Sequence, residues 1–473
     1  MKKIISFLLL VFAYVNAYSQ NVTVQLSPDV NDESANPEIF GINEQAFFAI
    51  SSKSEGEFYI ESFAIKELRR VYKKRIELPK TEDKPNVFEN IFYLNSHIYL
   101  VSSHQDKKLK KYTVYINEIK PNGELSLNHT VIDEISFNNK NYNCKYTFGL
   151  SSDSNRILLF RQYYDGDEAK EKVTYKAISK GLKVVNSKDL ELSGKPGKTA
   201  IANVLMDDEQ NLYYTEKQYY KSETEAGNLT RLFAVTYKPE TDSAYRTEIA
   251  MKETYFLDVN LQFNVQGNLI CSGNYSVDKT FGANLEENHG LKGIFYTIMD
   301  SKNLSILSQA HNNLQELFPD EKFYHYYLTN TYQLSENNLT VLCEFQHTVC
   351  DNGNCDQKFG DLLITKFDLN ETKNVSTKKI ETTSKGEKLL CKGGTRSFIS
   401  FQANRTVQLL YNCNKQYVID ADGNATMKNL YEDSANESLA FMKSSFRVNK
   451  NELLVLTYSK KTGHRFAKFS VVK

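Results

Sequence analysis

A short motif recurs eight times along this chain: an apolar segment, a turn that contains asparagine, and then a strand of alternating apolar residues. Intervals of 47 to 70 residues separate the eight asparagines, which are Asn43, Asn95, Asn155, Asn211, Asn268, Asn338, Asn404 and Asn451. This period is typical of stacked four-stranded sheets, because one small sheet cannot bury both faces until neighbours cover them. The repeat therefore predicts an all-β propeller of eight four-stranded blades, with seven as the alternative if one repeat is degenerate. Asparagine is expected at these turns because it tolerates a positive φ.

The two ends of the repeat array predict how such a ring closes. The last unit has segments for only three strands, at residues 445–448, 453–459 and 465–472. Residues 22–26 alternate apolar and polar side chains and precede the first inner strand, expected at 38–42. We therefore expect the N-terminal strand to complete the last blade, which would hide two exposed sheet edges.

The N-terminus has the composition of a secretory signal peptide. Two lysines are followed by an apolar run at 4–15, which at about 12 residues is too short to span a bilayer, and then by small residues. We expect a signal peptide over residues 1–19, with cleavage after Ala17 as the alternative, and one propeller domain over 20–473. No later stretch predicts a transmembrane segment. The protein is expected to be exported and to be periplasmic, associated with the outer membrane, or extracellular.

The balance of charge bears on the class of partner, and the content of aromatic residues bears on the fold. Lys plus Arg and Asp plus Glu number 58 each, so the chain has no net field to attract a nucleic acid, and we expect no nucleic-acid partner. The 30 Tyr and 28 Phe residues are suited to the cores between blades, and Trp is absent. The oligomeric state stays open.

In its repeat pattern the chain resembles secreted β-propeller proteins over nearly its whole mature length. The Gly-His and Trp-Asp dipeptides of the tryptophan-aspartate repeat family are missing, and the double glycine of kelch repeats is not periodic. The resemblance therefore implies an architecture and no specific family.

Seven cysteines in an exported chain make disulfides chemically possible. Cys350 and Cys355 flank a four-residue turn between two apolar segments, a spacing that would set them opposite each other in a hairpin and so favours a disulfide. The alternative, a metal site that adds Cys343 and His347, has no recognised spacing. Cys391 and Cys413 could form a second pair. The cysteines then left over are Cys144, Cys271 and Cys343.

Motifs that resemble catalytic or ligand-binding signatures are incomplete. The segment 194–199 contains Gly-Lys-Thr, but Leu192 stands where a phosphate loop has its first glycine. The segment 420–424 resembles the start of a calcium loop, but Tyr431 replaces the closing glutamate. No His-Glu-x-x-His or Gly-x-Ser-x-Gly occurs. We expect no metal and no cofactor.

Long connections concentrate in the fourth to sixth repeats and indicate where a site would lie. They cover 217–229, 272–292, 310–327 and 346–358, and in a propeller these connections emerge on one face of the disc. The candidate binding residues that they carry are Tyr219, Tyr220, Tyr275, Asp278, His289, Tyr324, His325 and Asp351.

Two function classes follow from these features. The first is a non-enzymatic binding or scaffold protein of the bacterial cell envelope that recognises a protein or a glycan through the long loops. The alternative is a hydrolase or lyase that acts on polysaccharide, with acids among Asp278, Glu286, Glu287 and Asp320. Glycoside hydrolysis would need two carboxylates about 5 to 10 Å apart.

Overall fold

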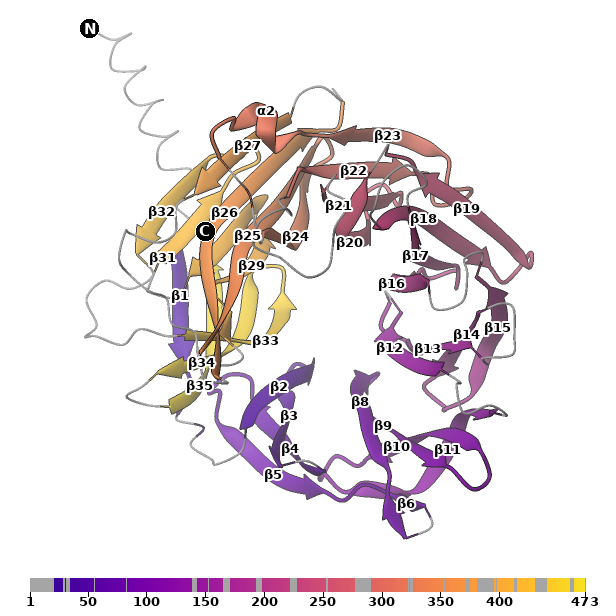
Figure 1. Ribbon diagram of the computed structural model, residues 1–473. Helices are drawn as coiled ribbons and strands as arrows, with labels where there is room; N and C mark the ends of the chain where they lie inside the picture. The colour runs from indigo at the N-terminus through magenta and orange to yellow at the C-terminus, as the bar shows by residue number, and fades with distance from the viewer. Residues whose placement is uncertain are drawn as a thin grey trace, which may run out of the picture.

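The computed structural model is a closed ring of β-sheets around a central channel (Figure 1). Within the described residues, no helix is long and apolar enough to cross a membrane. The predicted signal peptide lies outside the described residues. The structure describes residues 21–28, 30, 35–54, 56–81, 83–137, 143–151, 153–164, 171–192, 198–221, 228–251, 254–276, 291–321, 323, 326–351, 354–370, 375–380, 395–396, 398–411, 415–429, 440–459 and 463–472.

The first four blades are antiparallel sheets whose strands follow one another from the channel outward. Blade 1 contains β2 (Ala35–Ile42), β3 (Ala46–Ser54), β4 (Glu57–Ala64) and β5 (Arg70–Ile76). Blade 2 contains β8 (Val87–Leu94), β9 (His97–Asp106), β10 (Lys111–Ile119) and β11 (Leu125–Ser136), and β6 (Lys80–Thr81) pairs with β7 (Lys84–Pro85) just before it. Blade 3 contains β12 (Asn143–Leu150), β13 (Arg156–Tyr164), β14 (Lys172–Ser179) and β15 (Val184–Glu191). Blade 4 contains β16 (Thr199–Met206), β17 (Leu212–Lys221), β18 (Asn228–Lys238) and β19 (Ser243–Ile249).

The remaining blades continue the pattern, with a short helix α2 (Leu314–Leu317) between blades 5 and 6. Blade 5 contains β20 (Tyr255–Phe263), β21 (Leu269–Ser276), β22 (Gly293–Met299) and β23 (Ile306–His311). Blade 6 contains β24 (Tyr326–Ser335), β25 (Asn338–Asp351), β26 (Asn354–Asp368) and β27 (Val375–Ile380). Blade 7 contains β29 (Phe398–Ala403), β30 (Thr406–Tyr411), β31 (Lys415–Ile419) and β32 (Ala425–Asn429). Blade 8 contains β33 (Ala440–Asn449), β34 (Glu452–Ser459) and β35 (Gly463–Val472), and the two-residue strand β28 (Thr395–Arg396) pairs with β33.

The N-terminal strand closes the ring. β1 (Asn21–Leu26) pairs antiparallel with β35, so that Val24 lies opposite Phe469 (Figure 1). Directly after the strand, the Ser27 N–H donates to the Phe466 carbonyl at 2.8 Å, and the Phe466 N–H donates to Ser27 Oγ at 2.9 Å. The predicted propeller of eight blades, with the first strand completing the last blade, is confirmed.

The repeated turns use asparagine in more than one way. Asn95 and Asn404 have a positive φ of 48° each, as expected. At Asn211 the positive φ belongs to the preceding residue, Gln210. Asn43 instead accepts backbone hydrogen bonds from residues 45 and 46 through its side chain. The expectation that asparagine supplies the positive φ is therefore met at Asn95 and Asn404, whereas at Asn43 an Asx turn uses the side-chain oxygen instead.

The hydrophobic cores lie between neighbouring blades. Phe47 of blade 1 meets Phe466 of blade 8 edge to face, with the ring centroids 4.9 Å apart. Tyr296 of blade 5 meets Phe367 of blade 6 in the same way, also at 4.9 Å. Each aromatic pair joins two blades, so a sheet has a complete core only when its neighbours are present.

A buried ion pair adds a polar link between blades 2 and 3. Asp133 of β11 lies 2.6 Å from Arg161 Nη1 and 2.8 Å from Lys176 Nζ, and Tyr146 donates a hydrogen bond to it at 2.7 Å. Burial by itself would raise the pKa of Asp133, but these cations and the hydrogen bonds hold it below its usual value. The three partners all belong to blade 3, so this carboxylate fixes one blade against the next.

Cys350 and Cys355 face each other across the hairpin of β25 and β26, as the sequence predicts. They are directly paired residues in the register of these strands. Facing residues in an antiparallel pair have their Cα atoms about 4.5 to 5.5 Å apart, within the span of a disulfide. The second possible pair, Cys391 and Cys413, lies outside the described residues. The three remaining cysteines are free thiols: Cys144, Cys271 and Cys343.

Removing residues 20–28 should destabilise the ring. Val22, Val24 and Leu26 pack against the core between blades 7 and 8, and full burial of one such side chain contributes about 1.5 to 3 kcal/mol. We expect a melting temperature lower by several degrees or more, together with aggregation through the uncovered edge of β35, measured by thermal unfolding and light scattering. Thr23→Ala changes an exposed residue of the same strand and should leave both properties intact. A truncated protein that is as stable and monodisperse as the full mature chain would contradict this closure.

We predict that Cys350 and Cys355 form a disulfide when the protein folds in an oxidising environment. Peptide mapping without reductant should recover the hairpin as one cross-linked species, and reduction should free both thiols for alkylation. Cys343, a buried thiol on the same strand, is the internal control and should react with alkylating reagent only after unfolding. Complete alkylation of Cys350 and Cys355 in the folded, unreduced protein would refute the prediction.

Candidate functional site

The structure describes the surroundings of only some of the predicted site residues. Tyr219 and Tyr220 lie on β17, and Tyr219 is half-buried. Tyr275 of β21 is buried, and its hydroxyl donates to the Asn312 carbonyl at 2.7 Å. Asp351 ends β25, and the structure describes its backbone only. The other predicted residues lie outside the described residues: Asp278, His289, Tyr324 and His325.

The described parts of two of the four long connections are strand, so the prediction of loops is wrong for residues 217–221, 228–229, 346–351 and 354–358. β17 extends to Lys221 and β18 starts at Asn228, which places most of the segment 217–229 in a hairpin. β25 and β26 pair as far as Asp351 and Asn354, so the segment 346–358 is a long two-stranded ribbon. The backbone N–H and C=O groups of the two strands form hydrogen bonds with each other, which allows the ribbon to extend beyond the sheet.

A cavity of about 440 Å³ opens in the channel wall where blades 4, 5 and 6 meet. Its walls come mainly from the inner strands β16, β20 and β24 and from β17. The lining residues lie in the first half and the middle of each inner strand and from the middle to the end of β17. The side chains that define its chemistry are Asn203, Thr215, Lys217, Tyr219, Asp258, Asn260 and Asn330.

β-Bulges aim these polar side chains. The pairing register of the inner strand shifts between Ala202 and Leu205 in β16, with similar shifts in β20 and β24. Asn203 sits in the first bulge with φ 53°, and its Nδ2 donates to the Val259 carbonyl at 2.9 Å and to Thr215 Oγ1 at 3.2 Å. Bulges bend a strand and re-aim side chains, and asparagine tolerates the left-handed region that this one requires.

A glycine on the next strand makes room for the bulge that carries Asp258. A Cβ added to Gly273 would lie only 2.2 Å from the Asp258 carbonyl oxygen. The backbone N–H of Asp258 donates to Asn274 Oδ1 at 2.7 Å, and its side chain accepts a hydrogen bond from the Leu328 N–H at 3.1 Å. Blade 6 thereby fixes a carboxylate that belongs to blade 5.

Lys217 is the cation of the cavity. Its Nζ donates to the Leu257 carbonyl at 2.9 Å and lies 5.6 Å and 5.4 Å from the ring centroids of Tyr219 and Tyr255. Burial lowers the pKa of Lys217, and the nearby Asp258 carboxylate only partly opposes this effect. Because burying a charged lysine costs folding free energy, a buried lysine beside a cavity is a candidate functional residue.

The cavity offers amide, hydroxyl, ammonium and carboxylate groups together with an aromatic ring. Asp258 is the one carboxylate among its described lining residues. No group of three His, Cys, Asp or Glu side chains in the described part of the chain could hold a metal ion. Sequence reasoning missed Asn203, Asp258 and Asn330. A sequence signal for these residues was present, because each is a polar residue that interrupts the apolar pattern of an inner strand.

The lowered pKa of Lys217 predicts how stability depends on pH. As the pH rises toward the ordinary lysine value of 10.5, the unfolded chain binds more protons at this site than the folded chain does. The wild type should therefore gain stability relative to Lys217→Met as the pH is raised toward 10.5, measured by urea unfolding at several pH values. Lys238→Met, in the same blade, controls for the lost charge. A constant difference between the wild type and Lys217→Met would argue against a desolvated lysine.

Comparison with known proteins assigns no family to this chain. No family model matches the sequence. No curated protein matches it. A solved structure described as the Dos1 propeller is similar at 10% identity, with 94% of this chain and 95% of that chain covered and a TM-score of 0.48. The WD40 domain of SCAP from fission yeast has 10% identity, 95% and 98% coverage and a TM-score of 0.39. Cobalt-substituted Synechocystis ACO has 9% identity, 74% and 72% coverage and a TM-score of 0.36.

Proposed function

We propose that this protein is a non-enzymatic binding propeller of the bacterial cell envelope that recognises a glycan in the cavity of blades 4 to 6. The observation that carries the proposal is the lining of that cavity, where amides, a hydroxyl, an ammonium and a carboxylate from three blades surround one space. Export rests on the N-terminal sequence. The candidate partner is thus a carbohydrate chain.

The chemistry of the lining suits a ligand rich in hydroxyl groups. Asn260 and Asn330 carry amide oxygens that can accept from sugar hydroxyls, while their amide nitrogens donate to Gln262 Oε1 at 3.1 Å and to Ser400 Oγ at 2.7 Å. Tyr219, on the wall of the same space, offers a flat apolar face for a sugar ring. The cavity volume of about 440 Å³ falls within the range of small-molecule sites, which supports a ligand of a few sugar units.

Binding is favoured over hydrolysis by the number of carboxylates. Glycoside hydrolysis ordinarily uses two carboxylic acids that flank the scissile bond. The described lining contains only Asp258, and that side chain already accepts the Leu328 N–H. The alternative hydrolase or lyase would need a second acid. Asp320 does not line this cavity, and Asp278, Glu286 and Glu287 lie outside the described residues.

A glycan array tests this function. The mature protein should bind a defined set of bacterial surface oligosaccharides, and Tyr219→Ala should weaken that binding by about tenfold or more because it removes the aromatic wall. Tyr245→Ala is the matched control, since it makes the same change on the outer strand of the same blade. Binding that resists Tyr219→Ala would place the glycan elsewhere, and an array without signal would contradict glycan recognition. Release of reducing sugar from a bound oligosaccharide would favour the hydrolase.

A further inference from the structure

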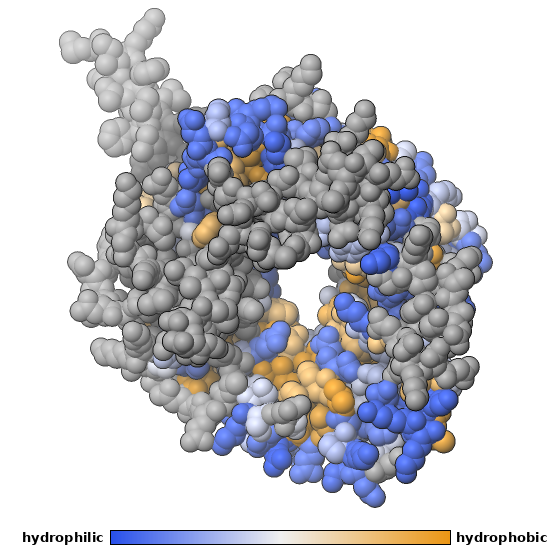
Figure 2. All heavy atoms as spheres, viewed as in Figure 1, coloured by the Kyte–Doolittle hydropathy of each residue, from blue (hydrophilic) through white to orange (hydrophobic). Residues whose placement is uncertain are grey.

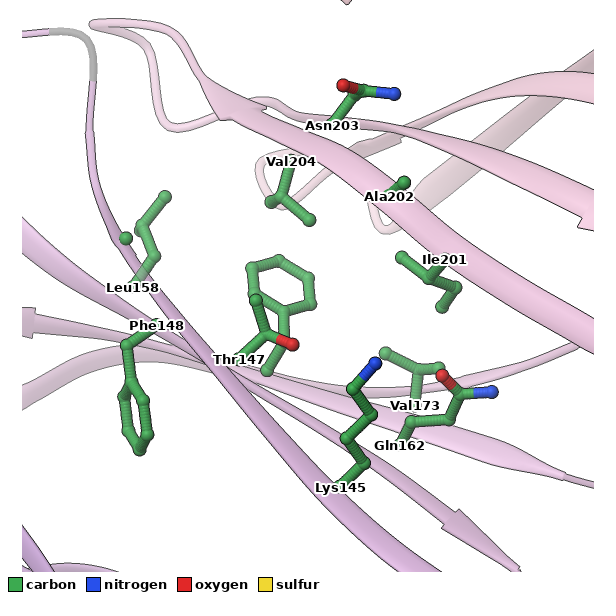
Figure 3. A pocket seen from close by; sticks show the side chains of 12 residues that line it. Lys145, Thr147, Phe148, Leu158, Gln162, Val173, Ile201, Ala202, Asn203 and Val204 are labelled. Atoms are coloured by element: carbon green, nitrogen blue, oxygen red, sulfur yellow. The ribbon is translucent and has the colours of Figure 1, made fainter. Parts of the chain in front are cut away.

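A second cavity, of about 170 Å³, lies between blades 3 and 4 beside the channel (Figure 3). Its walls come from the inner strands β12 and β16 and from β13 and β14. It shares Ala202 and Asn203 with the larger cavity but is otherwise lined by different residues. No function proposed above uses it.

The cavity exists because the inner strand of blade 3 presents no apolar side chain toward blade 4. Lys145, Thr147 and Gly149 alternate along β12 and line the space, whereas Phe148 points the other way, into the core with blade 2 (Figure 3). Among the described residues, the core between blades 3 and 4 contains nothing from β12. Each of the other seven cores has an apolar residue from the inner strand of the earlier blade, such as Phe40, Phe92, Leu205, Leu257, Leu334, Phe401 or Phe446.

Part of the lining of this cavity is apolar, and the whole cavity, at about 170 Å³, has room for a small ring. Leu158, Phe160 and Val173 are buried there, and Ile201 is half-buried on the opposite wall. An apolar cavity of about 150 Å³ suffices to bind benzene. The space between blades 3 and 4 therefore fits one aromatic ring or a short aliphatic chain.

The outer part is cationic. The polar ends of Lys145 and Thr147, which are both exposed residues, point into the same space beside Val173 (Figure 3), and Lys145 has no ion-pair partner among the described residues. Gln162 also lines the cavity, but its amide group donates to the Thr199 carbonyl at 2.9 Å and to Glu171 Oε1 at 2.8 Å. The described lining contains no carboxylate. An ammonium and a hydroxyl next to apolar side chains are suited to a ligand that has a carboxylate attached to an apolar group.

We propose that the cavity between blades 3 and 4 binds a small monocarboxylic acid whose apolar part is about the size of a benzene ring. The carboxylate contacts the Lys145 ammonium and accepts a hydrogen bond from the Thr147 hydroxyl. The ring lies between Phe160, Val173 and Ile201. This site is separate from the glycan site, because neither Lys145 nor Thr147 lines the larger cavity.

Benzoate is the probe for this site. Titration of the mature protein at neutral pH, followed by calorimetry or NMR shifts, should show saturable binding in the millimolar range or tighter. Benzamide, which has the same ring without the charge, should bind at least about tenfold more weakly than benzoate. The Lys145→Gln variant should bind benzoate more weakly than the wild type by a similar factor. No saturable benzoate binding, or equal affinity for benzoate and benzamide, would overturn the proposal.

A variant with a larger side chain inside the cavity distinguishes benzoate binding in this cavity from nonspecific attraction of benzoate to a cationic surface. A Cβ added to Gly149 or to Gly181 would meet no atom within 4 Å, so Gly149→Val and Gly181→Val should both fold, as checked by thermal unfolding. Gly149 lines the cavity, and its valine variant should lose benzoate binding. Gly181 lies in the turn after β14, and its variant should bind like the wild type. Full benzoate binding by a folded Gly149→Val variant would also overturn the proposal.

Discussion

Every blade of this propeller depends on its neighbours for burial, and β1 completes the last blade by pairing with β35. A four-stranded sheet has two apolar faces, and each face becomes part of a core only when the adjacent blade covers it. Phe466 shows this dependence: it packs on Phe47 and Phe63 of blade 1, while its backbone is held by Ser27 at the end of the closing strand. The first and last residues of the fold therefore stabilise the same interface.

The side chains of the inner strands determine where the space beside the channel is packed with apolar residues and where cavities remain. In blades 1 and 2 they bring Phe40, Phe88 and Tyr93 to the channel wall, where Figure 2 shows apolar residues between β2 and β8. From blade 3 to blade 6 the equivalent strands bring lysine, threonine and amide side chains, such as Lys145 and Asn330, and cavities open beside them. Burying these polar groups completely would cost free energy unless each found a partner, so space for water or a ligand remains.

Much of the architecture could be predicted from the chain because it rests on local patterns. The repeat of apolar segments and asparagine turns indicated eight blades, and the unmatched strand at residues 22–26 indicated the closure. The site was predicted less well. Tyr219 was chosen for its place in a long connection, and it does lie at the cavity, but on an extended strand. Asn203 and Asp258 were missed because their roles come from bulges that a strand pattern does not reveal.

By itself, the sequence determined the period, the strand alternation and the balance of charge, since these depend on neighbouring residues along the chain. Only the tertiary structure decided which polar side chains share a space. Lys217, Asp258 and Leu328 lie in three successive blades, and the hydrogen bonds of Lys217 with Leu257 and of Leu328 with Asp258 bring them together. Contacts between residues separated by 40 and 70 positions depend on how each sheet twists and bulges against the next. That geometry is set by packing between blades rather than by local propensity.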